Sequence, residues 1–207
     1  MTGTVEMRVF ELLMARLCHE LIGPVAAVNN GAEILAEGDA DFAADAVRLI
    51  ADSARRVGAR LQFYRFAYGL APAGGFSGSP PHELASAYFA ATRITCVYHE
   101  SARTLPLAWQ KLACNLLLVG AEALPRGGSL SVRAAAAGPA LTVSGGAAGL
   151  PPEVAAALAL SAPVEALTAR TVQGYFTGLL ARDLGCRLIS TPTGPEHFLL
   201  AAAASAD

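Results

Sequence analysis

The sequence predicts an α+β protein, in which an antiparallel helical hairpin that forms a four-helix bundle in a dimer is followed by an α/β sandwich. Three observations support this fold class. Apolar residues recur at helical spacing through the first third of the chain, a segment rich in glycine and proline follows, and helical and strand patterns then alternate to the end. The expected domains are a hairpin over residues 1–70, a linker over 71–81 and a sandwich over 82–207.

The composition is that of a folded protein with a sizeable core. The 207 residues are 54% hydrophobic and 15% charged, a balance that excludes intrinsic disorder for most of the chain. The net charge is −2 and the basic residues are spread along the chain, so we expect no nucleic acid partner. Although mean hydropathy is +0.43, the strongly apolar stretch 112–121 is shorter than the roughly 20 residues that a bilayer requires. We therefore expect no membrane association.

The N-terminus and the cysteines indicate a cytoplasmic protein. The first 20 residues carry acids and amphipathic spacing, where a signal peptide would have a basic start and a continuous apolar run. Cys18, Cys96, Cys114 and Cys186 lie far apart without a C-x-x-C pair. This spacing favours four reduced, mostly buried thiols over a zinc site or a disulfide framework. We expect neither a metal nor a cofactor.

The first element is a long helix over about residues 4–36. Its apolar positions follow steps of three and four, which draw one stripe along a helix: Phe10, Met14, Leu17, Leu21, Val25, Val28, Ala32 and Leu35. Gly38 and the acidic residues around it end this pattern. A second stripe begins near Asp41 and continues to Gly69. Because the connection is short, the two helices should be antiparallel neighbours.

A hairpin of two long helices leaves part of each apolar stripe exposed, because each helix contacts its partner along one line only. A two-fold dimer covers both stripes by joining two hairpins into a four-helix bundle. The hairpin therefore predicts a homodimer.

The second half alternates helices and strands. Helices are expected over about residues 82–93, 106–124 and 168–184 and after Pro151, and strands near residues 95–98, 129–136, 141–144, 187–190 and 197–203. Helices against a mixed sheet make a two-layer α/β sandwich.

The run His19-Glu20-Leu21-Ile22-Gly23-Pro24 lies inside the first helix. At about 100° per residue, His19 is turned roughly 200° from Leu17, so its imidazole points away from the apolar stripe. The neighbouring side chains are mostly small, which leaves room for the backbone of a partner protein. Pro24 removes a helical hydrogen bond, bends the helix just past His19 and frees a carbonyl one turn upstream.

An exposed imidazole on a rigid helix suits a nucleophile that must enter the active site of another protein. A neutral ring nitrogen can attack phosphorus and later leave as a phosphoramidate. The Glu20 carboxylate is close enough to assist proton transfer. We therefore take His19 and Glu20 as the catalytic candidates.

The runs LCHELIGPVAAVNNGAEIL and LIADSARRVGARLQFYRFAYG resemble the dimerisation domains of histidine kinases and, over a longer stretch, the ChpT-type histidine phosphotransferases of bacterial phosphorelays. This resemblance implies that His19 is the phosphorylated residue and that the second half is a degenerate kinase ATPase domain. It also implies that the partners are response regulator receiver domains and a hybrid histidine kinase, and that Mg²⁺ sits on the receiver.

The second half departs from the nucleotide-binding pattern of kinases. In the segment that corresponds to the kinase N-L-L-x-N-A box, Asn115 matches but the second asparagine is replaced by Val119, which cannot ligate a hard cation. In the segment that corresponds to D-x-G-x-G, Gly145 replaces the aspartate that would bind adenine and Ala147 replaces the first glycine. We expect this domain not to bind ATP, and we interpret its glycines as turns and Asn115 as a structural helix residue.

The docking surface for the receiver is expected to consist of Ile22, Gly23 and Ala26 near His19 and the facing surface of the second helix, in an interface below about 1,200 Å². Folding the hairpin near residue 38 brings His19 level with Val57 and Gly58 of the second helix. On this alignment Arg55 and Arg56, with Arg16, are candidates to contact the phosphoryl group or the receiver.

We thus predict a histidine phosphotransferase that takes a phosphoryl group from one receiver aspartate and passes it to another. Two alternatives stay open at this point: an ATP-dependent sensor histidine kinase core, and an adaptor that binds receivers without chemistry.

Overall fold

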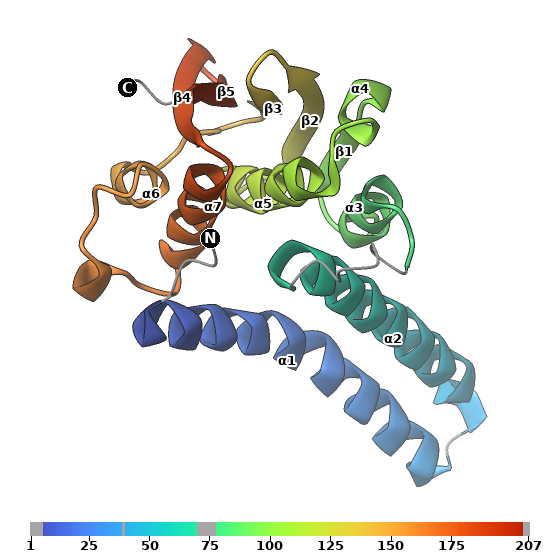
Figure 1. Cartoon of the computed structure of the whole chain (residues 1–207). Helices are drawn as coiled ribbons and strands as arrows, with labels where there is room; N and C mark the ends of the chain where they lie inside the picture. Colours follow the sequence, from blue (N-terminus) through green and yellow to red (C-terminus); the bar gives the residue numbers. More distant parts are fainter. Residues whose placement is uncertain (1–5, 39, 70–77, 205–207) are drawn as a thin grey trace.

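The computed structural model describes residues 6–38, 40–69 and 78–204. Helices α1 (Met7–Glu37) and α2 (Ala40–Tyr68) form the predicted antiparallel hairpin. Figure 1 shows the hairpin on one side of a helical layer and the sheet on the other. The predicted linker lies largely outside the described residues, and its last residue, Pro81, already begins α3.

The hairpin is closed by a glycine at one end of α1 and by a close helix contact further in. Gly38 adopts a left-handed conformation with φ 76°, and its N–H donates to the Leu35 carbonyl at 3.3 Å. This is the backbone geometry that favours glycine after a helix. At Gly31 a Cβ would lie 2.7 Å from Cγ1 of Ile50, so the missing side chain allows α1 and α2 to approach.

The second half contains the predicted helices and strands in the predicted order. Its elements are α3 (Pro81–Phe89), β1 (Ile94–Tyr98), α4 (Glu100–Arg103), α5 (Leu107–Glu122), β2 (Gly128–Ala135), β3 (Gly138–Ser144), α6 (Pro152–Leu158), the 3₁₀ turn η1 (Val164–Ala166), α7 (Val172–Asp183), β4 (Cys186–Gly194) and β5 (His197–Ala204). The short elements α4 and η1 were not predicted, because one turn is too short to show a helical period.

Several predicted boundaries were displaced by three or four residues. The strand expected near residues 141–144 begins at Gly138, and the strand expected near residues 187–190 continues to Gly194. The helix expected over residues 82–93 ends at Phe89, and the helix expected from residue 168 begins at Val172. Before α7, Thr168 and Thr171 exchange hydrogen bonds, with the Thr168 N–H donating to Thr171 Oγ1 at 3.0 Å and the Thr171 N–H to Thr168 Oγ1 at 3.3 Å. Such local bonds hold the chain in a turn and delay the helix.

The five strands form one sheet in the order β1-β2-β3-β5-β4, with β1 parallel to β2 and all other pairs antiparallel. Helices lie against one face of this sheet (Figure 1), which confirms the mixed two-layer sandwich. Residues 112–120 of α5 are all buried, and this helix forms the centre of the core together with Leu130, Leu141 and Leu200.

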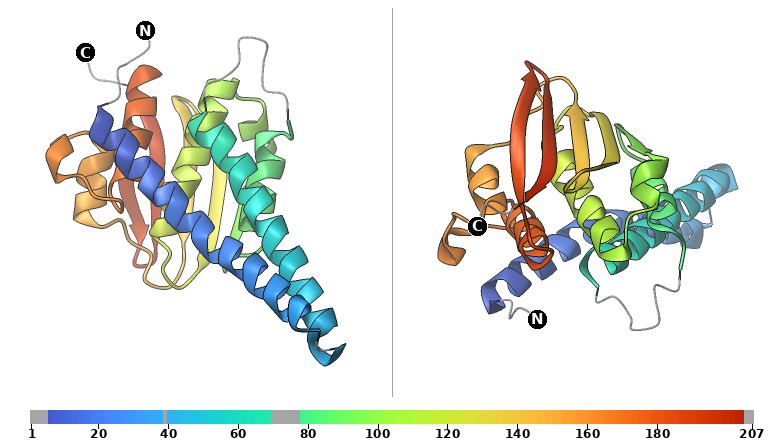
Figure 2. Two further views of the ribbon diagram at one scale, coloured as in Figure 1. Left: turned by 90° about the horizontal axis from the view of Figure 1, so that it is seen from below. Right: turned by 45° about the horizontal axis from the view of Figure 1, so that its top comes forward.

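The open end of the hairpin is fastened to the second half, and its loop end projects away (Figure 2). Val9 and Leu13 of α1 pack in a cluster with Leu167 and Val172. Arg8 adds two hydrogen bonds from its guanidinium, to the carbonyls of Val164 at 3.1 Å and Leu167 at 3.0 Å. The N-terminal part of α1 therefore lies at the junction between the hairpin and the sandwich.

The cysteines are less buried than the sequence predicts. Cys114 and Cys186 are buried, but Cys96 is half-buried and Cys18 is exposed. Cys18 directly precedes His19 in α1, and both side chains are exposed. Within residues 6–38, 40–69 and 78–204, no helix has the length and apolar content needed to cross a membrane.

Candidate functional site

His19 lies in the middle of α1 and its side chain is exposed, whereas Leu17 and Leu21 are half-buried. This is the arrangement that the helical wheel predicted, because His19 is on the opposite side of the helix from the apolar stripe. The backbone on both sides of His19 is helical. The imidazole is therefore carried by a rigid element and is accessible from outside.

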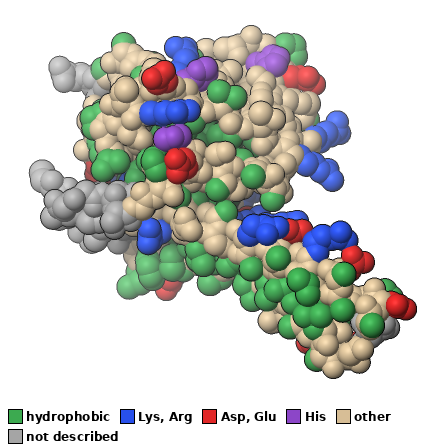
Figure 3. Space-filling model, turned by 90° about the vertical axis from the view of Figure 1, so that its right-hand side faces the viewer, with side chains coloured by type: hydrophobic (Ala, Val, Ile, Leu, Met, Phe, Trp, Pro, Cys, Tyr) green, Lys and Arg blue, Asp and Glu red, His purple; other side chains and the backbone are tan. Residues whose placement is uncertain are grey.

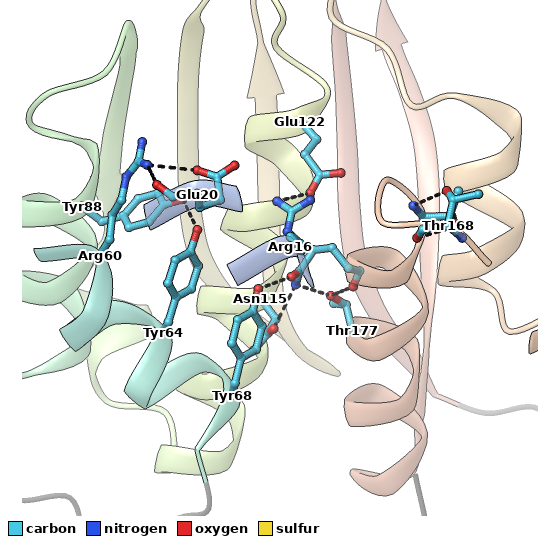
Figure 4. Close-up of polar contacts among 12 residues, drawn as sticks. Arg16, Glu20, Arg60, Tyr64, Tyr68, Tyr88, Asn115, Glu122, Thr168 and Thr177 are labelled. Atoms are coloured by element: carbon cyan, nitrogen blue, oxygen red, sulfur yellow. Dashed lines mark hydrogen bonds and ion pairs between the residues drawn. The ribbon is translucent and has the colours of Figure 1, made fainter. Parts of the chain in front are cut away.

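Glu20 is held by Arg60 of α2 just after the histidine. Pro24 has no N–H, so the carbonyl of Glu20, four residues earlier, lacks its helical donor. Arg60 Nη1 donates to this carbonyl and also lies 3.2 Å from Glu20 Oε2. The two contacts are visible in Figure 4. One arginine thus satisfies the carbonyl that Pro24 frees and fixes the carboxylate next to His19.

A surface cavity of about 560 Å³ lies beside His19, between α1, the end of α5 and the segment before α7. It is lined by Ala15, Arg16, His19, Glu20, Glu122, Ala169 and Arg170. We call it the His19 cavity. It combines an exposed imidazole with two guanidinium and two carboxylate groups, and both domains contribute to it.

Arg16 is not free on the hairpin surface, as a solvated helix charge would be. Its Nη2 atom lies 2.6 Å from Oε1 of Glu122, and the two side chains are 14% and 22% exposed. Figure 4 shows Glu122 above the Arg16 guanidinium. Burial raises the pKa of Glu122 to about 7, and the positive charge of Arg16 acts in the opposite direction. The ion pair connects the hairpin to the sandwich at the edge of the His19 cavity.

The three positions predicted for docking form an open surface one turn beyond His19. Ile22, Gly23 and Ala26 are all exposed, and Ile22 retains 66% of its accessible surface. A Cβ on Gly23 would meet nothing within 4 Å, and the same holds for Gly58 of α2. The surface is therefore accessible to the backbone of another protein.

Arg55 and Arg56 are not brought to the His19 cavity. They line a separate cavity of about 660 Å³ with Ala87 and Ala90 from the end of α3, and Arg55 forms an ion pair with Asp52. The α2 residue that reaches the histidine region is Arg60, because its long side chain extends to Glu20.

The residues that sequence reasoning missed are Arg60, Glu122 and Arg170. All three lie far from His19 in the sequence, and tertiary packing alone places them near it. One signal was available for Arg60, because the carbonyl freed by Pro24 requires a donor.

The residues of the kinase-like boxes are used for internal packing. Asn115 is fully buried, and its Nδ2 donates to the carbonyls of Ala67 at 2.8 Å and Lys111 at 2.9 Å. Its Oδ1 accepts from Nε2 of Gln173 at 3.0 Å, and Gln173 Oε1 accepts from the Tyr68 hydroxyl at 2.6 Å. Asn115 makes the predicted local bond and also ties α2 to α5 and α7.

The glycine-box segment forms a turn after β3, as predicted. The Ala148 N–H donates to the Gly145 carbonyl at 2.9 Å, and Ala147 has a left-handed φ of 62°. Among the described parts of the chain, no group of three or more His, Cys, Asp or Glu side chains is arranged to hold a metal ion.

Comparisons with known proteins agree with this architecture. The family model of the histidine phosphotransferase C-terminal domain matches residues 81–195. Protein phosphotransferase ChpT of Brucella abortus (strain 2308) is 39% identical over 183 residues, which cover 86% of this chain and 87% of that protein. A solved structure of a bacterial phosphotransferase is 36% identical, with a TM-score of 0.78 over 98% of both chains. The chain belongs to the histidine phosphotransferase family and is a histidine phosphotransferase of a phosphorelay.

Proposed function

We propose that His19 is the residue that carries the phosphoryl group. The observation that carries this proposal is the exposed imidazole on the rigid middle of α1, bordering a cavity that also contains Arg16 and Glu20. A nucleophile that serves two partner proteins must be reached from outside and must keep its orientation between encounters.

The transfer exchanges one phosphorus bond for another. A ring nitrogen of neutral His19 attacks the phosphorus of a receiver aspartyl phosphate, an N–P bond forms, and the P–O bond breaks with its electron pair leaving on the aspartate. The proton on the other ring nitrogen passes to the Glu20 carboxylate or to water. The same steps in reverse deliver the group to the aspartate of a second receiver. Mg²⁺ bound by the receiver would neutralise the charge of the transferring group.

We propose the receiver docking surface around Ile22, Gly23 and Ala26. The exposure of Ile22 offers an apolar anchor, and the open space at Gly23 permits close approach of a helix. Arg55 and Arg56 of α2 line a separate cavity, and their charge suits a second contact with an acidic receiver. In this proposal the phosphoryl donor is the receiver domain of a hybrid histidine kinase. The chain and its receiver partners would interact in the cytoplasm.

We propose a homodimer in which two hairpins form a four-helix bundle. Large apolar side chains outside the docking surface remain exposed on both helices of the single chain, among them Met7, Phe10, Val25 and Leu35 of α1 and Phe42, Leu49 and Leu61 of α2. Figure 3 shows hydrophobic side chains gathered along the projecting arm. Exposed apolar surface of this extent is typical of an interface.

We propose that phosphoryl transfer does not use ATP. The donors and the acceptor of the Asn115 amide are committed to protein groups, and Val119 is buried in the core. A side chain so engaged is not available to a magnesium ion without breaking the contact between α2 and α5.

The proposal is tested by incubating the purified chain with ³²P-labelled ATP, and separately with labelled phosphoreceivers from a panel of receiver domains. We expect label on the chain from a phosphoreceiver and none from ATP. Label acquired from ATP alone would identify a kinase, and binding of phosphoreceivers without any label on the chain would identify an adaptor.

A further inference from the structure

Glu122 is a residue of the sandwich domain that lies at the phosphotransfer site. It is the last residue of α5, and its carboxylate lines the His19 cavity together with Arg16 and His19 of α1. Nothing in the transfer chemistry of an imidazole requires an acidic side chain from a second domain at this position. Its presence therefore calls for an explanation.

The pair between Glu122 and Arg16 is close and largely buried. The Nη2 to Oε1 distance is 2.6 Å, and the two side chains are 14% and 22% exposed. Within the residues that the structure describes, Arg16 Nε and Glu122 Oε2 have no hydrogen-bond partner. A buried pair with unsatisfied atoms is a weak source of stability.

Arg16 precedes His19 by three residues, so the two side chains share a face of α1 one turn apart. An arginine in that place offers a planar set of donors that fits the oxygens of a phosphoryl group. A long side chain without a fixed partner would sample many rotamers, and ordering it would slow the transfer. Glu122 removes that freedom by holding the guanidinium at the cavity.

We propose that Glu122 is a positioning residue for phosphoryl transfer, which holds Arg16 at the His19 cavity so that the guanidinium meets the phosphoryl group. The inference rests on the proposed function, because it requires His19 to be the phosphorylated residue. In it, Glu122 acts through Arg16 and makes no contact with the phosphoryl group.

The surroundings of Glu122 make its ion pair with Arg16 sensitive to pH. Burial raises the pKa of the carboxyl to about 7, while Arg16 opposes the shift. The titratable and charged groups that face the pair are Arg16, His19 and Glu20 of α1, Tyr64 and Tyr68 of α2, and Arg170 before α7. Below pH 7 the carboxyl takes up a proton, and the ion pair with Arg16 is lost.

The test compares the full-length wild type with Glu122→Gln, which keeps the shape and removes the charge. The matched control is Glu153→Gln, because Glu153 is an exposed residue of α6 outside the cavity. The rate of phosphorylation is measured at a saturating concentration of a phosphoreceiver that labels the wild type, between pH 6 and 8.5. We expect Glu122→Gln to be about tenfold slower at pH 8, with an unchanged half-saturating receiver concentration, and Glu153→Gln to equal the wild type.

The ratio of the wild-type rate to the Glu122→Gln rate isolates the effect of Glu122, because any contribution from the His19 imidazole is common to these two proteins. We expect this ratio to approach one as the pH falls through about 7. We also expect the double variant Arg16→Gln/Glu122→Gln to be no slower than Arg16→Gln, since both changes remove one interaction.

A rate ratio that does not change with pH, or a double variant slowed by the product of the two single effects, would overturn the inference. A slower Glu122→Gln that melts at a lower temperature and shows a constant ratio would indicate a purely structural role, which also overturns it. Failure of the proposed function has a different signature: the wild type would then acquire no label on His19 from any phosphoreceiver.

Discussion

At the scale of single residues, a proline determines how the acid next to the histidine is held. Pro24 deprives the Glu20 carbonyl of its helical hydrogen bond, and Arg60 supplies the missing donor while pairing with the Glu20 carboxylate. The freed carbonyl and the positioned acid are therefore one feature. The contact between Arg60 and Glu20 connects α2 to α1 at the residue that follows His19.

We predict that Arg60→Ala lowers the free energy of unfolding by about 1–3 kcal/mol, because it leaves a carbonyl and a carboxylate without their partner. In the background of Pro24→Ala, which returns an N–H to the Glu20 carbonyl, the same change should cost less than half as much. Denaturant unfolding of the four proteins measures both values. Equal costs in the two backgrounds would show that Arg60 does not satisfy the carbonyl freed by Pro24.

The pKa of Glu122 predicts how stability depends on pH. Burial raises this pKa from 4.5 to about 7, so between these values the folded chain holds a proton that the unfolded chain has released. The stabilisation is complete below pH 4.5 and is lost as the pH rises through 7. Relative to Glu122→Gln, the wild type should gain up to about 3 kcal/mol as the pH falls from 8 to 4.5. Thermal melts across this range measure the difference, and parallel curves would contradict the assignment.

The local part of the site could be predicted from the sequence, and the distant part could not. His19, Glu20 and Pro24 lie within two helical turns, so helix geometry alone fixes how they face. Glu122 and Arg170 reach the same cavity through the packing of α5 and α7 against α1, which no local pattern encodes. For this reason Arg16 was expected to be free for a phosphoryl group or a receiver but is paired.

At the scale of elements, two glycines of α1 have opposite environments. A Cβ on Gly23 would meet nothing within 4 Å, whereas one on Gly31 would lie 2.7 Å from Ile50 Cγ1 and 3.1 Å from the Ala46 carbonyl oxygen. Gly31 therefore serves contact between the helices, and Gly23 leaves space outside the hairpin.

We predict that Gly31→Ala destabilises the hairpin by about 1–2 kcal/mol through overpacking. Gly23→Ala should instead stabilise the protein by up to about 1 kcal/mol, because alanine favours a helix. Denaturant unfolding curves of Gly31→Ala and Gly23→Ala test these two predictions. A stabilised Gly31→Ala would show that α1 and α2 do not pack this closely in solution.

The order of the elements could be predicted because each long helix and each strand carries its own period or alternation. Elements of one turn, such as α4 and η1, carry none. The start of α7 was also misjudged, since Thr168 and Thr171 form a turn where the apolar pattern continued into a helix.

At the scale of the whole molecule, the hairpin is fastened at its open end and extends freely at its loop end. Asn115, Gln173 and Tyr68 join α2 to the helical layer, and Val9 and Leu13 anchor α1. In the proposed dimer, a second copy of the chain would cover the exposed apolar residues of the projecting arm.

We predict that Leu49→Glu converts the dimer to a monomer, because it places a charge on an apolar position that is 38% exposed in the single chain. The loss of apolar burial and the cost of burying a charge should weaken association by about 100-fold or more. Ala44→Glu, about 140° around α2 from Leu49, is the control. Sedimentation velocity gives the masses, and a dimeric Leu49→Glu would exclude this face from the interface.

The most direct test of the account is to locate the phosphoryl group on the chain. After incubation with a labelled phosphoreceiver, the wild type should carry an acid-labile, base-stable phosphate that mass spectrometry assigns to His19. His19→Ala should carry none and should still dimerise, because its side chain lies off the apolar stripe. Label retained on His19→Ala would contradict the account.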